Sequence, residues 1–451
     1  MPPGRPLEAR GNARPRWMAA AAPRRATVVR QQNPAYKPTH PPNFVESHSP
    51  YLPDFMELHS LNSAILAPME RIPRLLDDLD TLRRPGRVTV IHGPRQVGKT
   101  NLVQHYLSSQ PGRSLAVTGD DVVVRNLLAS QDATQILAWS AGYDTVFIDE
   151  AQRIPDVGWA LKILIDARPD LNLIATGSAS FALAGQIGEP LTGRQTTLTL
   201  FPISAAELGT HLNDHELKKS LDNLLVYGMY PEVRTATSQA DQRDTILELT
   251  RSYLFKDILE LDRVRSAKAL VDLLTLVALQ LGSLVSLNEL AGQVGIDTKT
   301  VARYLSLFEQ CHILTNLRGF SRNLRSEITR TSKWYFYDTG VRNAIITNFN
   351  PLAHRDDTGV LWENFVVMER RKALSYARRD GGSFFWRTHE QNEIDLIEER
   401  DGQLHAYEIK WNPQAKAKRP TQFLAAYPDA HYEVITPDTL MESFTPLGGS
   451  S

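Results

Sequence analysis

The spacing of apolar residues divides the chain into stretches of different character. From about residue 68 to residue 210, short apolar runs alternate with segments of helical spacing, the first of them a predicted helix at 71–82. The runs predict strands at 88–91, 114–118, 145–149, 171–176 and 195–200. Strands that alternate with helices form parallel sheets with both faces covered. We therefore predict an α/β fold, with a parallel sheet between two layers of helices.

The next stretch is helical by its periodicity. Residues 211–280 predict a helical connector, and residues 286–308 predict two short helices separated by Gly295, with Ser286 and Asp297 as their caps. Two helices joined by a glycine turn are typical of a helix-turn-helix. With a β-wing after it, this pattern predicts a winged helix-turn-helix over residues 281–340.

The last stretch, residues 341–451, predicts a small α/β domain. In order, the pattern indicates a helix around 361–374 and strands at 383–388, 393–397 and 403–411, the last two joined by the turn 400–402. Side chains alternate along a strand, so Glu408 and Lys410 project to the same side. Asp395 on the neighbouring strand can join them around one point.

Residues 1–55 carry almost no periodic apolar residues and are rich in proline and arginine. This composition predicts a disordered basic tail. Three explanations stay open: a start codon assigned too far upstream, with Met56 or Met69 as the true start, a basic arm that touches nucleic acid, or an arginine-rich targeting peptide.

Composition narrows the classes of protein. A chain of 451 residues is too long for one hydrophobic core. Its net charge of −1 means that contact with nucleic acid needs a local basic patch. The single cysteine, Cys311, excludes disulfides and thiolate zinc sites and fits a reducing cytosol, so we expect a cytoplasmic protein. The longest apolar stretch, 270–281, is too short to cross a bilayer, so we expect no membrane partner.

Candidate chemistry begins directly after the first strand. The loop that follows consists of Gly93, Pro94, Arg95, Gln96, Val97, Gly98, Lys99 and Thr100, and a helical pattern leaves it. In this strand, loop and helix order, backbone N–H groups and the helix dipole cradle phosphates. Lys99 is expected to reach the β- and γ-phosphates, and Thr100 to ligate Mg²⁺. We therefore expect ATP and Mg²⁺ as cofactors.

Further site residues are expected at the ends of the later strands. Asp149 would hold Mg²⁺ through water, and Glu150 would orient or deprotonate the attacking water. Ser178 either senses the γ-phosphate or caps the next turn. Arg194 is either a surface residue or an arginine finger for the nucleotide of its own or a neighbouring subunit, the latter in a homo-oligomer.

These motifs resemble AAA-type P-loop ATPases, in particular a prokaryotic group that shares the loop sequence and the acid motif Asp149-Glu150-Ala151-Gln152. The resemblance implies an ATPase domain over residues 56–210. This group also carries an uncharacterised carboxyl-terminal domain, whose landmarks occur here at 227–232, 337–340, 363–366 and 407–410. In the first landmark, Met229-Tyr230 stands where the family more often has a second glycine.

Glu363 on its helix, with Asp395, Glu408 and Lys410, resembles the PD-(D/E)XK nuclease core. The resemblance implies that the three carboxylates bind Mg²⁺ and that Lys410 stabilises charge or positions the nucleophile. Such folds can also lose catalysis and keep binding, and hairpins with alternating charges are common.

Basic residues near the predicted wing favour DNA as a partner. Near the start of the second helix these are Lys299 and Arg303, together with the hydroxyl residues Thr298 and Thr300. After that helix they are Arg318, Arg322, Arg325, Arg330 and Lys333. Winged-helix units can instead serve in packing or oligomerisation. We favour a Mg²⁺-dependent ATPase whose nucleotide state controls a DNA-interacting, nuclease-like module. The rival interpretation is an ATP-driven regulatory switch with a non-catalytic carboxyl-terminal domain.

Overall fold

A computed structural model of the chain describes residues 71–177, 190–261, 266–321, 332–379, 381–388 and 392–444. The expectations for the tail 1–55, for Ser178 and for Arg322, Arg325 and Arg330 lie outside these residues.

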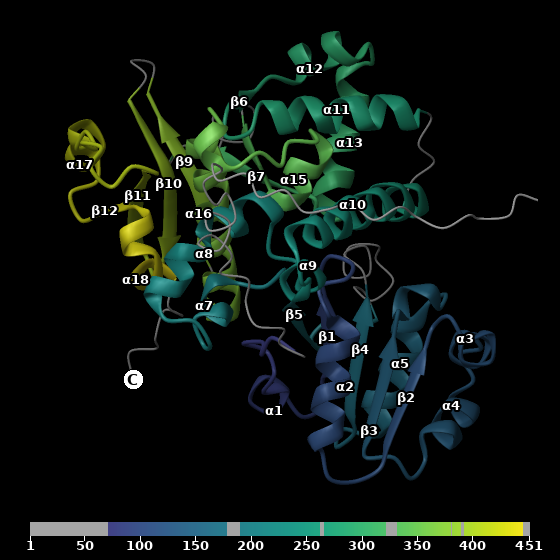
Figure 1. The fold of residues 1–451 in the computed structure, drawn as a ribbon. Coiled ribbons are helices and arrows are strands. Elements are labelled where there is room, and N and C mark those ends of the chain that lie inside the picture. The colour runs from purple at the N-terminus through teal and green to yellow at the C-terminus, as the bar shows by residue number, and fades with distance from the viewer. Residues whose placement is uncertain are drawn as a thin grey trace, which may run out of the picture. The chain divides into compact units, whose positions relative to one another are not determined.

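The first sheet consists of parallel strands, as the pattern predicted. They are β1 (Val88–His92), β2 (Ser114–Thr118), β3 (Thr145–Asp149), β4 (Asn172–Gly177) and β5 (Gln195–Thr199). Their order in the sheet is β2-β3-β4-β1-β5, and every pair is parallel (Figure 1). Because the strands run in one direction, the segments after β1, β3 and β4 emerge at the same edge of the sheet.

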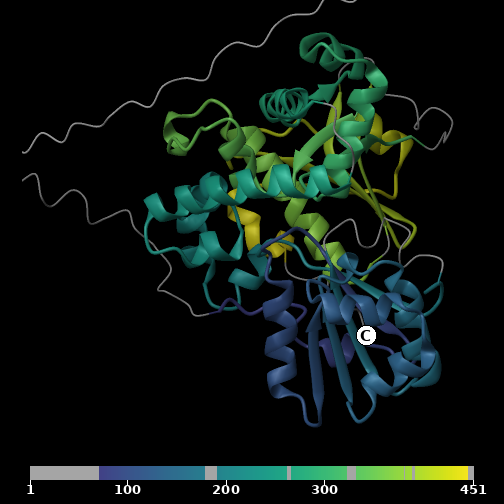
Figure 2. The same ribbon diagram turned by 90° about the vertical axis from the view of Figure 1, so that its right-hand side faces the viewer.

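Helices cover both faces of this sheet, which confirms the predicted layers. They are α2 (Lys99–Ser109), α3 (Val122–Ala129), α4 (Ala133–Ser140) and α5 (Val157–Ala167), with a short helix η1 (Ala151–Arg153) after β3. Ile91 of β1 packs in one core cluster with Leu102 of α2, and its neighbour Val90 packs in another with Leu164 of α5. This alternation follows from the pleat of the strand, and Figure 2 shows helices on either side of the strands.

The predicted helix at 71–82 is wrong for most of its length. Only α1 (Leu79–Leu82) is helical. Pro73 disfavours helical geometry in the residue before it, and the Asp77 carboxylate accepts a hydrogen bond from the backbone N–H of Arg74 at 2.8 Å. This non-helical segment places Arg74 against the phosphate loop, as described below.

Helices dominate the middle of the chain, as predicted. They are α7 (Ala205–Leu208), α8 (Asp214–Tyr227), α9 (Pro231–Thr235), α10 (Gln239–Leu261) and α11 (Ala267–Leu279). In the part of the chain that the structure covers, no helix is both long and apolar enough to cross a membrane.

The two helices and the hairpin expected over 281–340 are present. The elements are β6 (Leu284–Val285), α12 (Leu287–Val294), α13 (Thr298–Gln310), β7 (Leu314–Gly319) and β8 (Ser332–Phe336). Gly295 ends α12 in the left-handed region with φ of +75°, and Asp297 caps α13 by accepting a hydrogen bond from Thr300 N–H at 3.0 Å.

The last part of the chain completes a second sheet. Its elements are α15 (Thr339–Ile345), η2 (Leu352–His354), α16 (Thr358–Tyr376), β9 (Gly381–Arg387), β10 (Glu393–Arg400), β11 (Gln403–Ile409), α17 (Thr421–Ala426), β12 (His431–Ile435), η3 (Pro437–Thr439) and α18 (Leu440–Phe444). Asp401 and Gly402 both have positive φ, at 51° and 76°, so the predicted turn is of the type that matches the twist of a hairpin.

This second sheet crosses the domain boundary expected at residue 340. Its strand order is β12-β11-β10-β9-β7-β8-β6, so the hairpin of β7 and β8 and the carboxyl-terminal strands are continuous (Figure 1). The junction is a parallel pairing of β7 with β9, in which Arg318 is opposite Phe384.

Candidate functional site

The loop between β1 and α2 has the backbone shape of a phosphate cradle. Gly93 and Gly98 have φ of +148° and +92°. A Cβ atom on Gly93 would lie 2.1 Å from the carbonyl oxygen of Leu200, so a side chain cannot be accommodated there. The Lys99 Nζ donates hydrogen bonds to the carbonyl oxygens of Gly93 at 3.0 Å and Pro94 at 2.7 Å. These bonds hold a buried ammonium group inside the loop, where a bound phosphate would offer it charged acceptors.

Two of the expected Mg²⁺ ligands lie side by side. Thr100 Oγ1 donates a hydrogen bond to Asp149 Oδ2 at 2.8 Å, and Thr176 Oγ1 donates one to Asp149 Oδ1. Hydroxyl and carboxylate oxygens are the ligands that Mg²⁺ prefers, so this pair fits the ion. The sequence did not identify Thr176, whose only sign was its place at the end of the strand beside β3.

Glu150 stands directly after β3 in a left-handed conformation, with φ of 47°. Its Oε2 accepts a hydrogen bond from Gln152 Nε2 at 2.5 Å. A non-glycine residue in this region of φ carries a cost in free energy, and such residues cluster at functional sites. Gln152, the last residue of the acid motif, therefore orients the carboxylate that is expected to act on water.

One pocket of about 520 Å³ brings Lys99, Thr100 and Glu150 together. Its wall contains loop residues, Glu150 and two residues from helices outside the first sheet, namely Arg95, Gln96, Gly98, Lys99, Thr100, Asn101, Glu150, Glu232 and Ser252. Glu232 belongs to α9 and Ser252 to α10. The sequence predicted the loop and Glu150, whereas no pattern pointed to the contribution of α9 and α10.

Arg194 cannot be an arginine finger for its own nucleotide, which corrects that part of the expectation. It precedes β5, and Val88 N–H at the start of β1 donates to its carbonyl oxygen at 2.8 Å. The phosphate loop follows the other end of β1, about 16 Å away along a strand of five residues. The Arg194 guanidinium pairs with Asp166 at 2.5 Å. A finger for a neighbouring subunit stays a prediction.

Arg74 is a buried residue that holds the phosphate loop in place, and no sequence pattern pointed to it. Its guanidinium donates to the carbonyl oxygens of Val97 at 2.7 Å and Phe201 at 2.6 Å, and to the Glu207 carboxylate at 3.0 Å. These partners lie 23 to 133 residues away in the sequence. One side chain thus ties the phosphate loop to the segment after β5.

The four residues matched to the nuclease core occupy one neighbourhood in the second sheet. Lys410 Nζ lies 2.6 Å from Glu408 Oε1 and 3.9 Å from Asp395 Oδ2. Burial, and then the nearby charge of Asp395, raises the pKa of the Glu408 carboxyl. Burial also raises the pKa of Glu363 on α16, and the Lys333 ammonium opposes that shift while Asp395 adds to it.

Lys333 belongs to this cluster and not to a DNA-contacting surface, which corrects its expected role. The residue is 3 % exposed. Its Nζ lies 3.1 Å from Glu363 Oε1 and 2.6 Å from Glu393 Oε1, so its charge is already paired. Tyr335 donates a further hydrogen bond to Glu363 at 2.6 Å. Among the residues that the structure describes, no three His, Cys, Asp or Glu side chains are arranged to hold a metal ion.

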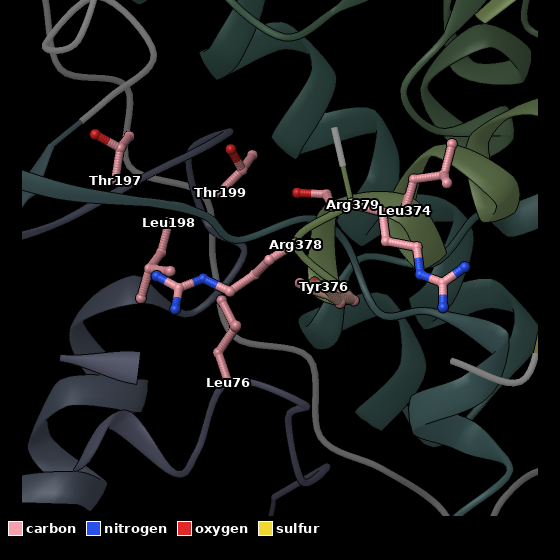
Figure 3. Close-up of a pocket in the computed structure, with 9 residues that line it drawn as sticks. Leu76, Thr197, Leu198, Thr199, Leu374, Tyr376, Arg378 and Arg379 are labelled. Carbon is pink, nitrogen blue, oxygen red and sulfur yellow. The ribbon is translucent and has the colours of Figure 1, made fainter. Parts of the chain in front are cut away.

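A second cavity, of about 290 Å³, lies between β5 and the end of α16. Arg378 and Arg379 both line it, together with Thr197, Thr199 and Tyr376. Figure 3 shows the two guanidinium groups pointing to opposite sides. Because they do not converge on one point, this cavity lacks the paired cations that would identify an anion site.

The start of α13 presents basic residues to solvent. Lys299 and Arg303 are exposed, and Arg318 on β7 is exposed as well. Thr298 and Thr300 are half-buried, and Thr300 Oγ1 donates to Asp297 at 2.6 Å. The exposed pair on α13 therefore stands where the sequence placed a recognition helix.

Three family models match the chain. An AAA domain matches residues 85–209, and two domains of unknown function, DUF8612 and DUF4143, match residues 218–352 and 358–442. Uncharacterised proteins of Mycobacterium tuberculosis and Mycobacterium bovis are each 29 % identical over 360 residues, which is 77 % of this chain and 77 % of theirs. An uncharacterised protein of Haemophilus influenzae is 23 % identical over 283 residues, covering 57 % of this chain and 69 % of its own.

Solved structures with some likeness include a Walker-type ATPase of Pyrococcus abyssi, with a TM-score of 0.41 and 15 % identity over 60 % of this chain and 94 % of that one. The Holliday junction branch migration motor RuvB of Thermotoga maritima has a TM-score of 0.24 and 18 % identity over 51 % of this chain and 81 % of its own. The family matches agree with the parallel sheet, the phosphate loop and the strand-end acids described above. The chain therefore carries an AAA-type P-loop ATPase domain followed by a carboxyl-terminal DUF4143 domain.

Proposed function

We propose that the chain is a Mg²⁺-dependent ATPase whose nucleotide state controls a DNA-interacting carboxyl-terminal module. The observation that carries the ATPase is the single pocket shared by Lys99, Thr100 and Glu150, with Asp149 bonded to Thr100. Lys99 binds the phosphates, Thr100 and Asp149 hold the ion, and Glu150 orients the attacking water. Bound Mg²⁺ would supply neutralisation of the charge that develops on the phosphates.

A buried set of polar contacts supports control of one half by the other. Arg74 joins the Val97 carbonyl of the phosphate loop to Glu207 of α7. The backbone N–H of Ala205, also in α7, donates to Glu369 of α16 at 2.7 Å. Lys372 of the same helix donates to the Ile203 carbonyl at 2.8 Å and to Glu369 at 2.6 Å.

Helix α16 also carries Glu363 of the acid and lysine cluster. A change in the shape of the phosphate loop is therefore connected, through contacts that are fully buried, to the helix that holds part of the second site. Coupling through packed elements of this kind is a physical link between sites, and its strength is a free energy that an assay can measure.

Glu150→Gln is expected to bind ATP with Mg²⁺ as the wild-type protein does and to hydrolyse it roughly 10²- to 10⁴-fold more slowly, because the amide cannot take a proton from water. Phosphate release with and without DNA measures both turnover and its coupling to the second half. Glu442→Gln, an exposed glutamate of α18, is the matched control and should hydrolyse ATP normally. Undiminished turnover in Glu150→Gln would remove that residue from the mechanism.

For the carboxyl-terminal half, the double change Lys299→Glu and Arg303→Glu is expected to weaken DNA binding at least 10-fold at low salt. Both residues are exposed on α13, and each lost phosphate contact reduces the salt dependence by about 0.9 in the slope of log K against log salt. Gel shifts at two salt concentrations measure both the loss of DNA affinity and the change in its salt dependence. The pair Lys416→Glu and Lys418→Glu makes the same charge change at another exposed site and is the control. Equal losses in both pairs would contradict a specific surface on α13.

A cleavage assay with the same DNA distinguishes a nuclease from a module that only binds DNA. If the wild-type protein nicks DNA with Mg²⁺ or Mn²⁺, and Asp395→Ala and Lys410→Ala do not, the result would support a nuclease. Intact DNA under every nucleotide state would support the non-catalytic interpretation. The ion pairs of Lys333 favour the non-catalytic interpretation, since this ammonium group is not part of the matched nuclease core and already neutralises charge at Glu363 and Glu393.

A further inference from the structure

The nucleotide pocket receives a carboxylate from outside the ATPase domain. Glu232 lies beyond residues 85–209, which match the AAA domain, and lines the same pocket as Lys99 and Glu150. Its side chain is exposed, whereas Val233 and Arg234, its neighbours in α9, are buried. Arg234 Nη1 donates to Asn223 Oδ1 of α8 at 2.7 Å. Helix α9 therefore has a buried side, linked to α8 through Arg234, and an exposed side on which Glu232 lines the pocket.

The position of α9 is set by the carboxyl-terminal half. Asp338 Oδ2 accepts a hydrogen bond from Met229 N–H at 2.6 Å, and its Oδ1 caps α15 at Val341 N–H. A Cβ atom on Gly228 would lie 1.9 Å from Asp338 Oδ1, and one on Gly340 would lie 2.1 Å from the Tyr227 carbonyl oxygen. The chain before α9 and the start of α15 are thus in close contact, with no room for a side chain at either glycine.

Charge gives this arrangement a consequence for nucleotides. Lys99 and Glu150 are the groups expected at the γ-phosphate and its attacking water. Glu232 lines the same pocket, and its carboxylate repels that phosphate, because like charges interact unfavourably even in a partly aqueous site. ADP lacks the γ-phosphate and meets less of this repulsion.

We propose that Glu232 is a specificity-determining residue that makes the pocket discriminate between nucleoside triphosphate and diphosphate. The inference rests on the proposed nucleotide site. When a triphosphate binds, its repulsion of Glu232 favours a displacement of α9. The hydrogen bond from Met229 to Asp338 couples that displacement to α15. Glu232 thereby reports the presence of the γ-phosphate to the half of the chain that fixes its position.

The test compares two ligands in the presence of Mg²⁺, a non-hydrolysable ATP analogue and ADP, by titration calorimetry on the full chain. Glu232→Gln is expected to bind the analogue roughly 5- to 10-fold more tightly than the wild type does, with ADP affinity changed less than about 2-fold. Glu232→Asp keeps the charge and should retain the wild-type ratio of the two affinities. Glu442→Gln, exposed on α18, should change neither affinity.

The outcomes separate this inference from the nucleotide site itself. If the wild type binds both ligands and Glu232→Gln shifts both affinities equally, or neither, the role of Glu232 is overturned while the site stands. If the wild type binds neither ligand, both are overturned. A loss of thermal stability with parallel weakening of both ligands would mark Glu232 as merely structural and would also overturn the proposal.

Discussion

Lys99→Ala is expected to abolish ATP hydrolysis and to weaken ATP binding at least 100-fold. Lys99 is 7 % exposed, and its ammonium group lies inside the loop, bonded to the carbonyl oxygens of Gly93 and Pro94. In the complex it exchanges these neutral acceptors for charged phosphate oxygens, and hydrogen bonds between two charged groups contribute about 1.5–3 kcal/mol each. Alanine removes all of this without altering the glycines that shape the loop.

Phosphate release and the binding of a fluorescent ATP analogue measure the two effects of Lys99→Ala separately. Lys162→Ala is the control: this lysine lies on α5 and pairs with Asp166 at 3.3 Å on the surface. It should hydrolyse ATP as the wild type does. Normal ATPase activity in Lys99→Ala would show that the loop is not the nucleotide site.

Glu207→Ala is expected to lower the free energy of unfolding by about 3–5 kcal/mol, because removal of one partner leaves the buried charge of Arg74 uncompensated. The two side chains are 1 % and 5 % exposed. Burial alone would lower the pKa of Arg74, but the Glu207 carboxylate raises it above its usual value, so the guanidinium stays charged at any working pH. Glu207 also accepts hydrogen bonds from Leu75 N–H and Ser204 N–H, which the alanine would leave without a partner.

Urea unfolding followed by circular dichroism measures the effect of Glu207→Ala. Asp272→Ala breaks an ion pair of the same kind on the surface, where Lys268 is 86 % exposed, and should cost less than about 1 kcal/mol. Because Arg74 also holds the Val97 carbonyl of the phosphate loop, Glu207→Ala should weaken ATP binding as well. Equal stabilities for the two variants would show that the buried pair has no structural role.

The sequence predicted those parts of the molecule whose chemistry requires neighbouring residues. The loop from Gly93 to Thr100 and the acids after β3 are contiguous, so their motif contains most of the information that their geometry needs. The turn at Asp401 and Gly402 was predictable for the same reason, since a two-residue hairpin turn depends on its own φ angles.

Residues defined by distant partners were missed or misread. Arg74 contacts Glu207 across 133 positions, and no local pattern distinguishes it from a surface arginine. Lys333 was assigned to a basic surface because other basic residues surround it in the sequence, whereas the fold turns it inward to Glu363 and Glu393. At Arg194 the surface alternative fits the fold: the residue stands at the start of β5, at the edge of the parallel sheet away from the phosphate loop, and pairs with Asp166.

The parallel pairing of β7 with β9 joins the strands of the carboxyl-terminal half in one sheet, and this sheet sets the distance between α13 and the acidic cluster. Helix α13 precedes β7, and Asp395 and Glu408 stand on strands two and three positions further across the same continuous sheet. If a duplex docks on α13, the strands from β7 to β11 set the number of base pairs that separate that helix from Asp395 and Glu408. The length of the footprint on DNA would then be a property of this sheet.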